Sequence, residues 1–304
     1  MAENVYITDS GWQIPRIKEM SEDKKRYDRL NQLLYDVADR IFQDDKHKDL
    51  LDGSRRTAVI IGSSYGLIGN QRRFLEQLYQ TGAVLPSQML LTTNNLLSEL
   101  LALKYKIHGD CFTIVDGATS GCAAIEIGMR LIRSGVVDSA VAGGVDTIDE
   151  VTQSRVEQLR RSNVVKPDYV CNEGCAAVLL EAETYVKNKE RHAVIDNICQ
   201  GSFYDCEELK CELKQVLCNV RSGDLYYGNM NSSVYDEVEE EVCNMYGIKP
   251  VAIKKITGET GAASGVLQVI AAADIPLNSY ICQIGFHGKY SCIRVKGGII
   301  EKRQ

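Results

Sequence analysis

Apolar and polar positions along the chain follow two periods, one typical of buried strands and one typical of amphipathic helices. Short apolar runs bounded by small residues predict strands at 5–8, 57–61, 111–115 and 138–147. Helix-spaced apolar positions predict helices at 70–81 and 122–134, each closed by a glycine, and a charged helical stretch at 21–49. The order strand, small-residue turn, helix, strand is typical of an α/β fold.

The second part of the chain repeats this order of elements without repeating individual residues. Strands are predicted at 171–182, 192–202 and 224–227, followed by an acidic helix at 235–247. The segment PVAIKK (250–255) predicts a further strand before a Gly-rich turn and a small-residue helix, and two strands close the chain. We therefore expect a single unit over 1–304 with pseudo-repeated halves at about 1–165 and 166–304. The segment 182–223 is the least patterned.

Composition excludes several classes of function. The chain has 304 residues and a net charge of −6, which argues against nucleic acid or an anionic membrane as the main partner. No segment approaches the roughly 20 apolar residues of a membrane span, and no signal-peptide pattern opens the chain, so we expect a cytoplasmic protein. We interpret the eleven cysteines as small buried residues, and expect no metal or other cofactor because no histidine clusters with them. We expect the acidic run 236–241 to be a solvated helix face.

The stretch GATSGCAAIEIGMRLIRSG (117–135) combines a tight turn with the start of a helix. Such a turn can hold one side chain at a helix N-terminus, where free N–H groups stabilise a thiolate or a developing oxyanion. The residue on this turn is Ala118, which has no reactive atom. Small residues here are also what close packing alone would select.

Five segments resemble motifs of the β-ketoacyl–acyl-carrier-protein synthases, the condensing enzymes of the thiolase fold, and along the chain they follow the order that these motifs have in the family. Residues 117–147 resemble the nucleophile turn, helix and AGG strand, and CNEGCAAVLLE resembles the EGAAVLVLE strand. KKITGETGAASG resembles KxxxGHxxGAAG, GFHGKYSCIRV resembles the terminal GFGGxNxxxxV, and YGNMNSSVYDEVE resembles the HGTGTxxxDxxE segment. The resemblance, from about 5 to 295, implies a five-layered αβαβα thiolase fold with two pseudo-repeated halves.

The departures from the family motifs carry the functional prediction. In that family a cysteine at the turn holds the acyl chain as a thioester, and two histidines assist decarboxylation. The resemblance places Ala118 at the cysteine, Glu259 at the second histidine and, through Asp236 and Glu239, Gly228 at the first. Without the thiol and both imidazoles, we expect no condensation by this chain.

Three other residues are candidates near the site. Cys122 lies one helical turn beyond Ala118, so we expect a core cysteine and not a nucleophile. The GFHGK loop resembles the family's loop beside the pocket, which makes Phe286 and His287, with Ala118, the predicted substrate-binding residues. A hydrogen-bonded structural histidine is the alternative for His287.

The resemblance implies a catalytically degenerate subunit similar to a chain-length factor of type II polyketide synthases. Its partners would be an active ketosynthase, forming a heterodimer, and an acyl carrier protein. This chain departs from typical chain-length factors, which often carry glutamine at the turn, and it is shorter between residues 181 and 226. Two alternatives stay open. One is an acyltransferase or decarboxylase that uses Cys122, Glu259 or His287, and the other is a stand-alone acyl-binding scaffold.

Overall fold

A computed structural model describes residues 3–15, 26–43, 47–189 and 192–298. The strands are β1 (Val5–Gln13), β2 (Thr57–Gly62), β3 (Cys111–Ile114), β4 (Ser139–Asp146), β5 (Gly174–Ala182), β6 (Ala193–Ser202), β7 (Leu225–Tyr227), β8 (Asn278–Gly285) and β9 (Lys289–Lys296). The helices are α1 (Arg26–Phe42), α2 (Lys48–Leu51), α3 (Ile68–Thr81), α4 (Pro86–Leu90), α5 (Leu96–Tyr105), α6 (Ser120–Arg133), α7 (Glu150–Arg161), α8 (Cys206–Leu217), α9 (Tyr235–Met245), α10 (Lys254–Thr257) and α11 (Ala262–Ala273), with a 3₁₀ turn at Glu183–Tyr185.

The described strands form one sheet in the order β3-β2-β4-β5-β1-β6-β9-β8-β7. From the β1–β6 junction outward, the two arms have matching order: β1, β5, β4, β2 on one side and β6, β9, β8, β7 on the other. Even β3 has a counterpart, because Val251 forms a single parallel bridge beside β7, as β3 pairs with β2. The two pseudo-repeated halves are therefore confirmed. Because β5 pairs with β4 and β1, the halves divide between Ala182 and Ala193, later than the expected position near 165.

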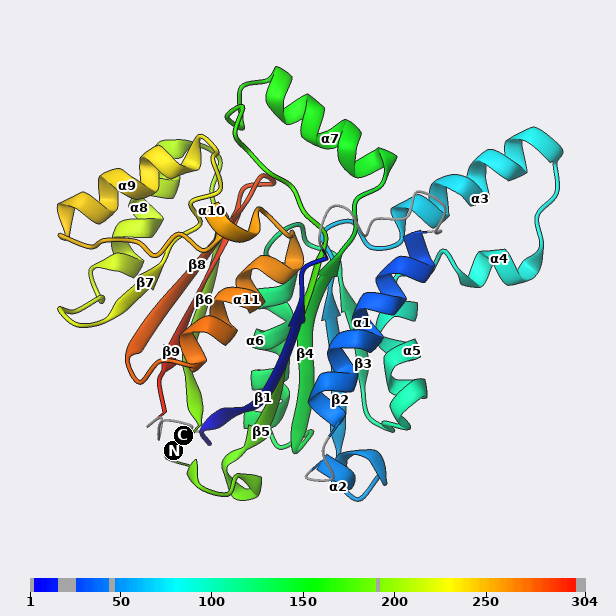
Figure 1. Ribbon diagram of the computed structural model, residues 1–304, viewed down its shortest axis with the longest axis horizontal. Coiled ribbons are helices and arrows are strands. Elements are labelled where there is room, and N and C mark those ends of the chain that lie inside the picture. Colours follow the sequence, from blue (N-terminus) through cyan, green and yellow to red (C-terminus); the bar gives the residue numbers. More distant parts are fainter. Residues whose placement is uncertain (1–2, 16–25, 44–46, 190–191, 299–304) are drawn as a thin grey trace.

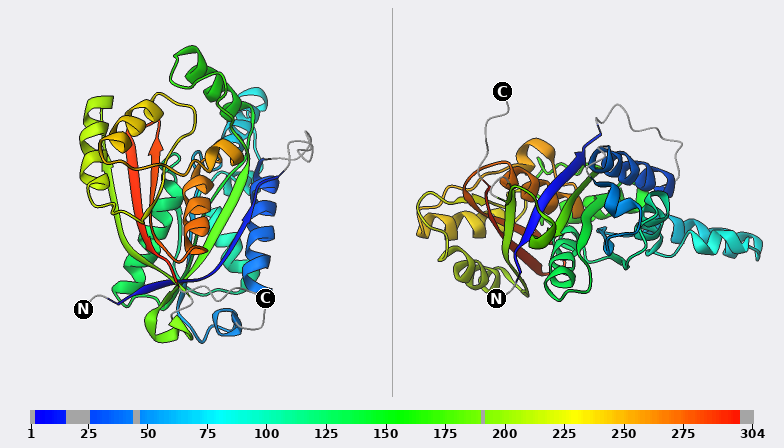
Figure 2. Two further views of the ribbon diagram at one scale, coloured as in Figure 1. Left: turned by 60° about the vertical axis from the view of Figure 1, so that its left-hand side comes forward. Right: turned by 90° about the horizontal axis from the view of Figure 1, so that it is seen from below.

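Helices cover both faces of the sheet and give five layers: α1 and α5 cover the first arm, α6 and α11 lie between the two arms, and α8 and α9 cover the second arm (Figures 1 and 2). In β2, Ala58 and Ile60 belong to the core around α6 and α11, whereas Val59 and Ile61 belong to the core under α1 and α5. In the second arm, Ile281 of β8 joins the central core and its neighbours join a third core under α8 and α9. Strands buried on both faces are typical of sheets sandwiched between helices. The predicted αβαβα thiolase-like fold is confirmed.

The local predictions differ from the structure in three places. The strand expected at 250–255 is reduced to the Val251 bridge, because the chain turns into α10 directly afterwards. The least patterned segment contains the regular helix α8, whose first turn is capped by the Asp205 carboxylate, 2.9 Å from the Glu208 N–H. The charged helical stretch expected at 21–49 corresponds to α1, which ends at Phe42, and residues 21–25 and 44–46 lie outside the described part of the chain.

Helices α3 and α4 project from the body beside the β3 end of the sheet (Figures 1 and 2). They are joined by a hydrogen bond of 2.9 Å between the side chains of Gln88 and Gln77. Apolar side chains stay exposed on this arm: Leu75, Leu78, Tyr79, Leu85, Met89 and Leu90. None of the helices in the described part of the chain has both the length and the apolar character needed to cross a membrane.

Candidate functional site

The candidate site lies where the N-termini of the two central helices, α6 and α11, meet. The backbones approach so closely that a Cβ on Gly121 of α6 would collide with the carbonyl oxygen of Ala262 in α11. A Cβ on Gly144, near the end of β4, would collide with the same carbonyl. Small residues at these positions are therefore required by packing, and they bring two helix N-termini with their free N–H groups to one place.

A cavity of about 310 Å³ opens at this meeting point. Four residues singled out in the sequence line it: Ala118, Glu259, Phe286 and His287. Its remaining walls come from the β2, β3 and β4 ends, the α7 helix and the segment before β5, and the lining residues include Asp116, Asp146, Arg155, Leu159, Tyr169 and Cys171. Gly228 and Cys122 are not part of the lining.

The turn that carries Ala118 is fixed by its backbone and by Ser120. Gly117 has φ 60, a conformation that favours glycine. The Ser120 hydroxyl receives a hydrogen bond of 2.7 Å from the Asp116 N–H and lies 2.7 Å from the Gly117 carbonyl oxygen. A Cβ on Gly117 would lie 2.5 Å from the His287 ring, so the imidazole packs directly on the turn. The elbow is thus built and held, but the residue at its tip carries only a methyl group.

Asp146 ties three elements together on the floor of the cavity. One of its carboxylate oxygens accepts from the Ser63 hydroxyl at 2.9 Å, and the other accepts from the Ala262 N–H at 2.7 Å. The second contact places a negative charge at the N-terminus of α11, where the helix dipole favours it. Asp146 therefore joins the end of β2 and the end of β4 to the start of α11; it lies within the 117–147 motif but was not singled out from the sequence.

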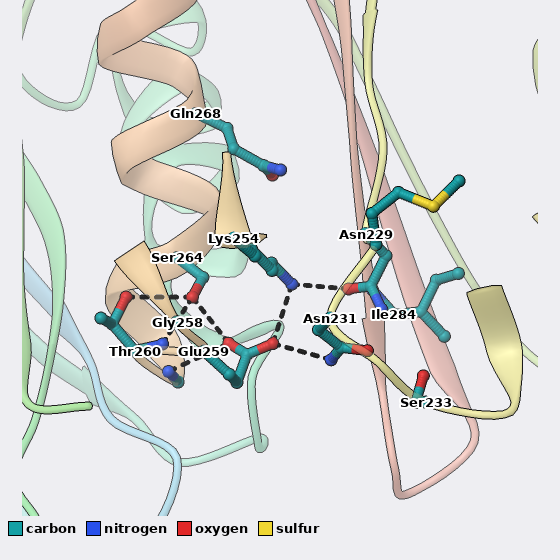
Figure 3. Close-up of polar contacts among 12 residues, drawn as sticks. Asn229, Asn231, Ser233, Lys254, Gly258, Glu259, Thr260, Ser264, Gln268 and Ile284 are labelled. Atoms are coloured by element: carbon teal, nitrogen blue, oxygen red, sulfur yellow. Dashed lines mark hydrogen bonds and ion pairs between the residues drawn. The ribbon is translucent and has the colours of Figure 1, made fainter. Parts of the chain in front are cut away.

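Glu259 is held in a buried ion pair beside the cavity (Figure 3). The Lys254 Nζ lies 2.9 Å from Oε2, and the side chains of Lys254 and Glu259 are 1% and 5% exposed. Oε2 also accepts from Asn231 Nδ2 at 2.9 Å, while Oε1 accepts from the Ser264 hydroxyl at 2.6 Å and the Gly261 N–H at 3.1 Å. Each carboxylate oxygen thus receives two hydrogen bonds.

This arrangement fixes the protonation state of Glu259. Burial raises the pKa of the carboxyl group, but the charge of Lys254 and the hydrogen bonds from Ser264, Lys254 and Asn231 outweigh it, so the pKa is lowered. The carboxylate is therefore ionised at neutral pH, and its lone pairs are already used by four donors. Glu259 can neither donate a proton to an enolate nor act readily as a base.

Comparison with known proteins agrees with this architecture. The profile described as "Beta-ketoacyl synthase, N-terminal domain" matches residues 5–184, more than half of the chain. The chain belongs to the beta-ketoacyl synthase family. Over 220 residues it is 26% identical to a subunit of the polyunsaturated fatty acid synthase of Thraustochytrium sp., covering 62% of this chain and 11% of that protein. This ketosynthase-family chain thus spans about a tenth of the length of its curated relative.

Solved structures share the fold at low sequence identity. "The ishigamide ketosynthase/chain length factor" matches with a TM-score of 0.75 and 18% identity, over 92% of this chain and 83% of that one. The complex "Ketosynthase (ApeO) in Complex with its Chain Length Factor (ApeC) from Xenorhabdus doucetiae" matches with a TM-score of 0.75 and 15% identity, over 97% of this chain and 98% of that one. A complex of a type II polyketide acyl-carrier protein with its ketosynthase, AntDE:AntF, matches with a TM-score of 0.77 and 15% identity, over 98% of this chain and 100% of that one.

The loop after β7 places two buried amide side chains, Asn229 and Asn231, beside the ion pair. Lys254 Nζ donates to the Asn229 side-chain oxygen at 2.6 Å, and Asn231 contacts Glu259, so these two residues extend the ion pair (Figure 3). The carbonyl oxygen of Gly228, the residue aligned by spacing with the first histidine, accepts a hydrogen bond of 2.8 Å from Gln268 Nε2. The Gly228 alignment remains a prediction. Within this segment the structure brings Asn231, which no sequence motif singled out, to the ion pair.

The acidic run of the same ketosynthase motif is not simply a solvated face. Asp236 and Glu239 are buried, whereas Glu237, Glu240 and Glu241 are exposed. One Asp236 oxygen accepts from the Ser232 N–H at 2.9 Å, and one Glu239 oxygen accepts from the Asn229 N–H at 2.9 Å. The expectation of a solvated helix face therefore holds for the three exposed glutamates but was wrong for Asp236 and Glu239, whose carboxylates accept hydrogen bonds from N–H groups of the loop after β7.

Three groups could supply displaced chemistry in this ketosynthase frame. Cys122 is fully buried away from the cavity, and burial raises the pKa of its thiol to about 12. Cys171 lines the cavity, but burial, followed by the charge of Glu259, also raises its pKa to about 12. His287 Nε2 lies 3.5 Å from Asp116 Oδ1, and burial lowers the pKa of the imidazole despite that carboxylate. Both thiols are therefore protonated at neutral pH, and the histidine is neutral.

Proposed function

We propose that this chain is a non-catalytic ketosynthase-like subunit, a chain-length factor, that pairs with an active ketosynthase in polyketide or fatty-acid-type chain elongation. One observation carries the proposal. The elbow and its cavity are kept, while Ala118 stands at the tip and the Glu259 carboxylate is fully engaged by Lys254, Asn231, Ser264 and Gly261. A built cavity without a nucleophile fits a role in shaping substrate space.

The character of the cavity wall supports this role. Apolar residues from α7 and the last hairpin face the space, among them Val156, Leu159 and Phe286. The Phe286 ring is held between aromatic neighbours, with its centroid 6.0 Å from those of Tyr169 and Tyr235. This apolar part of the wall can bound an acyl chain by volume alone. We propose that Ala118, Phe286 and His287 contact the acyl chain.

Exposed apolar surface at the β3 end of the sheet supports a protein partner. Strand β3 is an edge strand, and Phe112 on it is 40% exposed. Leu103 on the adjoining α5 is 76% exposed, and the α3–α4 arm lies at the same end. An edge strand flanked by apolar side chains is a ready site for pairing with a second chain. We propose that the active ketosynthase pairs here, and that an acyl carrier protein delivers substrate to the complex.

Co-expression with an intact ketosynthase tests the proposal. Size-exclusion chromatography should show a 1:1 complex, and the complex should elongate acyl chains from malonyl-loaded carrier protein while neither subunit does so alone. Elongation by the ketosynthase alone at the same rate and to the same length would contradict the role. A stable homodimer that binds acyl groups without a ketosynthase would instead support the scaffold alternative.

The pairing of His287 with Asp116 favours one further candidate, a decarboxylase or acyltransferase with displaced residues. The imidazole lines the cavity, packs on Gly117 and is neutral, so it could accept a proton. Turnover of malonyl thioesters by the isolated chain, lost in His287→Ala and kept in His192→Ala, would establish this function. Absence of turnover in the isolated wild-type chain removes it.

A further inference from the structure

Three cysteines form a row across the second arm of the sheet, apart from the cavity. In the strand register, Cys292 of β9 lies directly opposite Cys199 of β6 on one side and Cys282 of β8 on the other. Directly opposite residues in antiparallel strands place their side chains on the same face. All three belong to the apolar layer under α8 and α9. Their order across the face is therefore Cys199, Cys292, Cys282.

Solvent can reach one end of this row. A depression of about 370 Å³ is lined by Cys199 and Cys292, together with Tyr280, Tyr290 and Arg294. Cys199 is partly exposed, whereas Cys282 and Cys292 are buried. A small oxidant can therefore meet the more exposed Cys199 first, with Cys292 beside it on the neighbouring strand.

The contact between the two thiols divides their roles. A hydrogen bond from Cys292 lowers the pKa of Cys199 in spite of burial, while the same contact, with burial, raises the pKa of Cys292. Together with its partial exposure, this lowered pKa makes Cys199 the sulfur of the pair that meets an oxidant, and buried Cys292 its partner. A metal site is not the explanation, because no three His, Cys, Asp or Glu side chains among the described residues converge to hold an ion.

We propose that Cys199 and Cys292 are a peroxide-responsive thiol pair that closes into a reversible disulfide between β6 and β9. The Cα atoms of directly opposite antiparallel residues lie about 4.5–5.5 Å apart. That separation is within the range of about 4.4–6.8 Å found across disulfides. The two strands can therefore be joined without a change of register. The site lies away from the cavity and does not depend on the proposed function.

The chemistry balances with one hydrogen peroxide per disulfide. The Cys199 thiolate attacks a peroxide oxygen, the O–O bond breaks, and the departing hydroxide takes up a proton to become water, leaving a sulfenic acid on Cys199. The Cys292 sulfur then attacks the Cys199 sulfur, an S–S bond forms, the S–O bond breaks, and a second water leaves with the Cys292 proton. Two thiols lose two electrons in total, and a dithiol reductant reverses the reaction by exchange.

Peptide mapping of the full chain tests the assignment. The chain is treated with hydrogen peroxide, free thiols are blocked with N-ethylmaleimide, and trypsin digestion follows without reductant. We expect the peptide 192–210, which contains Cys199, to be linked to 290–294, which contains Cys292, and the link to disappear with dithiothreitol. The wild-type chain alone gives this result, so it does not depend on the folding of a variant.

Two substitutions identify the sulfur in the linked peptide. Peptide 192–210 also contains the exposed Cys206, so Cys206→Ser should keep the link and Cys199→Ser should remove it. A link that survives Cys199→Ser, a link from Cys292 to Cys282, or wild-type Cys292 recovered as the N-ethylmaleimide adduct after Cys199 has been oxidised would each overturn the proposal.

Discussion

Neutralising Glu259 should destabilise the protein far more than neutralising a surface carboxylate in a similar ion pair. Glu259→Gln keeps the side-chain shape but leaves the Lys254 ammonium, which is 1% exposed, without its counter-charge. Removing one partner of a buried ion pair costs about 3–5 kcal/mol, because the remaining charge stays desolvated. At about 2 °C per kcal/mol for a chain of this size, Tm should fall by about 6–10 °C.

The matched control is Glu237→Gln. Glu237 pairs with Lys166 at 3.1 Å, but the two side chains are 72% and 46% exposed, so the loss should stay below about 1 kcal/mol. Urea unfolding monitored by circular dichroism measures both variants, and Lys254→Met combined with Glu259→Gln should recover part of the loss. Losses of unfolding free energy that are equal within about 0.5 kcal/mol for Glu259→Gln and Glu237→Gln would refute the buried-pair account, because burial is what separates the two pairs.

The pH dependence follows from the same pair. The pKa of Glu259 is lowered in the folded protein from its ordinary value of 4.5, so below that pH the unfolded chain binds more protons. The contribution is complete above pH 4.5 and is lost as the pH falls through the lowered folded-state pKa. Glu259→Gln should therefore show a shallower loss of stability on acidification than the wild type, and an equal slope would contradict the assignment.

Three further outcomes are expected. Ala118→Cys should react with an acyl thioester or iodoacetamide, because a thiol at the elbow faces the cavity, but the variant alone should form no β-ketoacyl product. Mass spectrometry detects the adduct and product analysis tests the second part, which product formation would contradict. In NMR titrations His287 should titrate below its ordinary pKa of 6.5; Asp116→Asn should lower the midpoint further and Lys289→Met should raise it, and unchanged midpoints would count against these contacts. Phe112→Lys should abolish complex formation with the ketosynthase in size-exclusion chromatography while leaving Tm within a few degrees, and a retained complex would place the interface elsewhere.

Short-range patterns along the sequence predicted more of the fold than of the site. The apolar run of β2 and the 3–4 spacing of Cys122, Ile125, Met129 and Ile132 on α6 identify elements whose burial is complete, so they are predictable locally. Helix α8 had a readable signal that was missed, the Asp205 cap followed by Leu209 and Leu213. The expected strand at 250–255 failed because strand-like composition does not reveal that α10 starts at Lys254.

Long-range contacts explain what the sequence could not show at the site. Asp146 and Ala262, which are hydrogen-bonded, lie 116 positions apart in the sequence, and the hydrogen-bonded Asn231 and Glu259 lie 28 positions apart. Sequence patterns predict neither of these contacts, because each depends on how α11 packs against the ends of the strands. The family resemblance identified Glu259 as a departure, but only the structure shows that Lys254 makes it a fixed anion. The resemblance likewise singled out Asp236 and Glu239 within the acidic run, but only the structure shows that they are buried.

Intact-protein mass spectrometry of acyl loading tests the central claim most directly. The purified complex of this chain with an active ketosynthase is incubated with an acyl carrier protein thioester, and the masses of both subunits are measured. The account predicts an acyl adduct on the ketosynthase and an unchanged mass for this chain, because Ala118 offers no nucleophile and the Cys122 and Cys171 thiols are protonated. A covalent acyl adduct on this chain, formed at a rate that supports turnover, would contradict it.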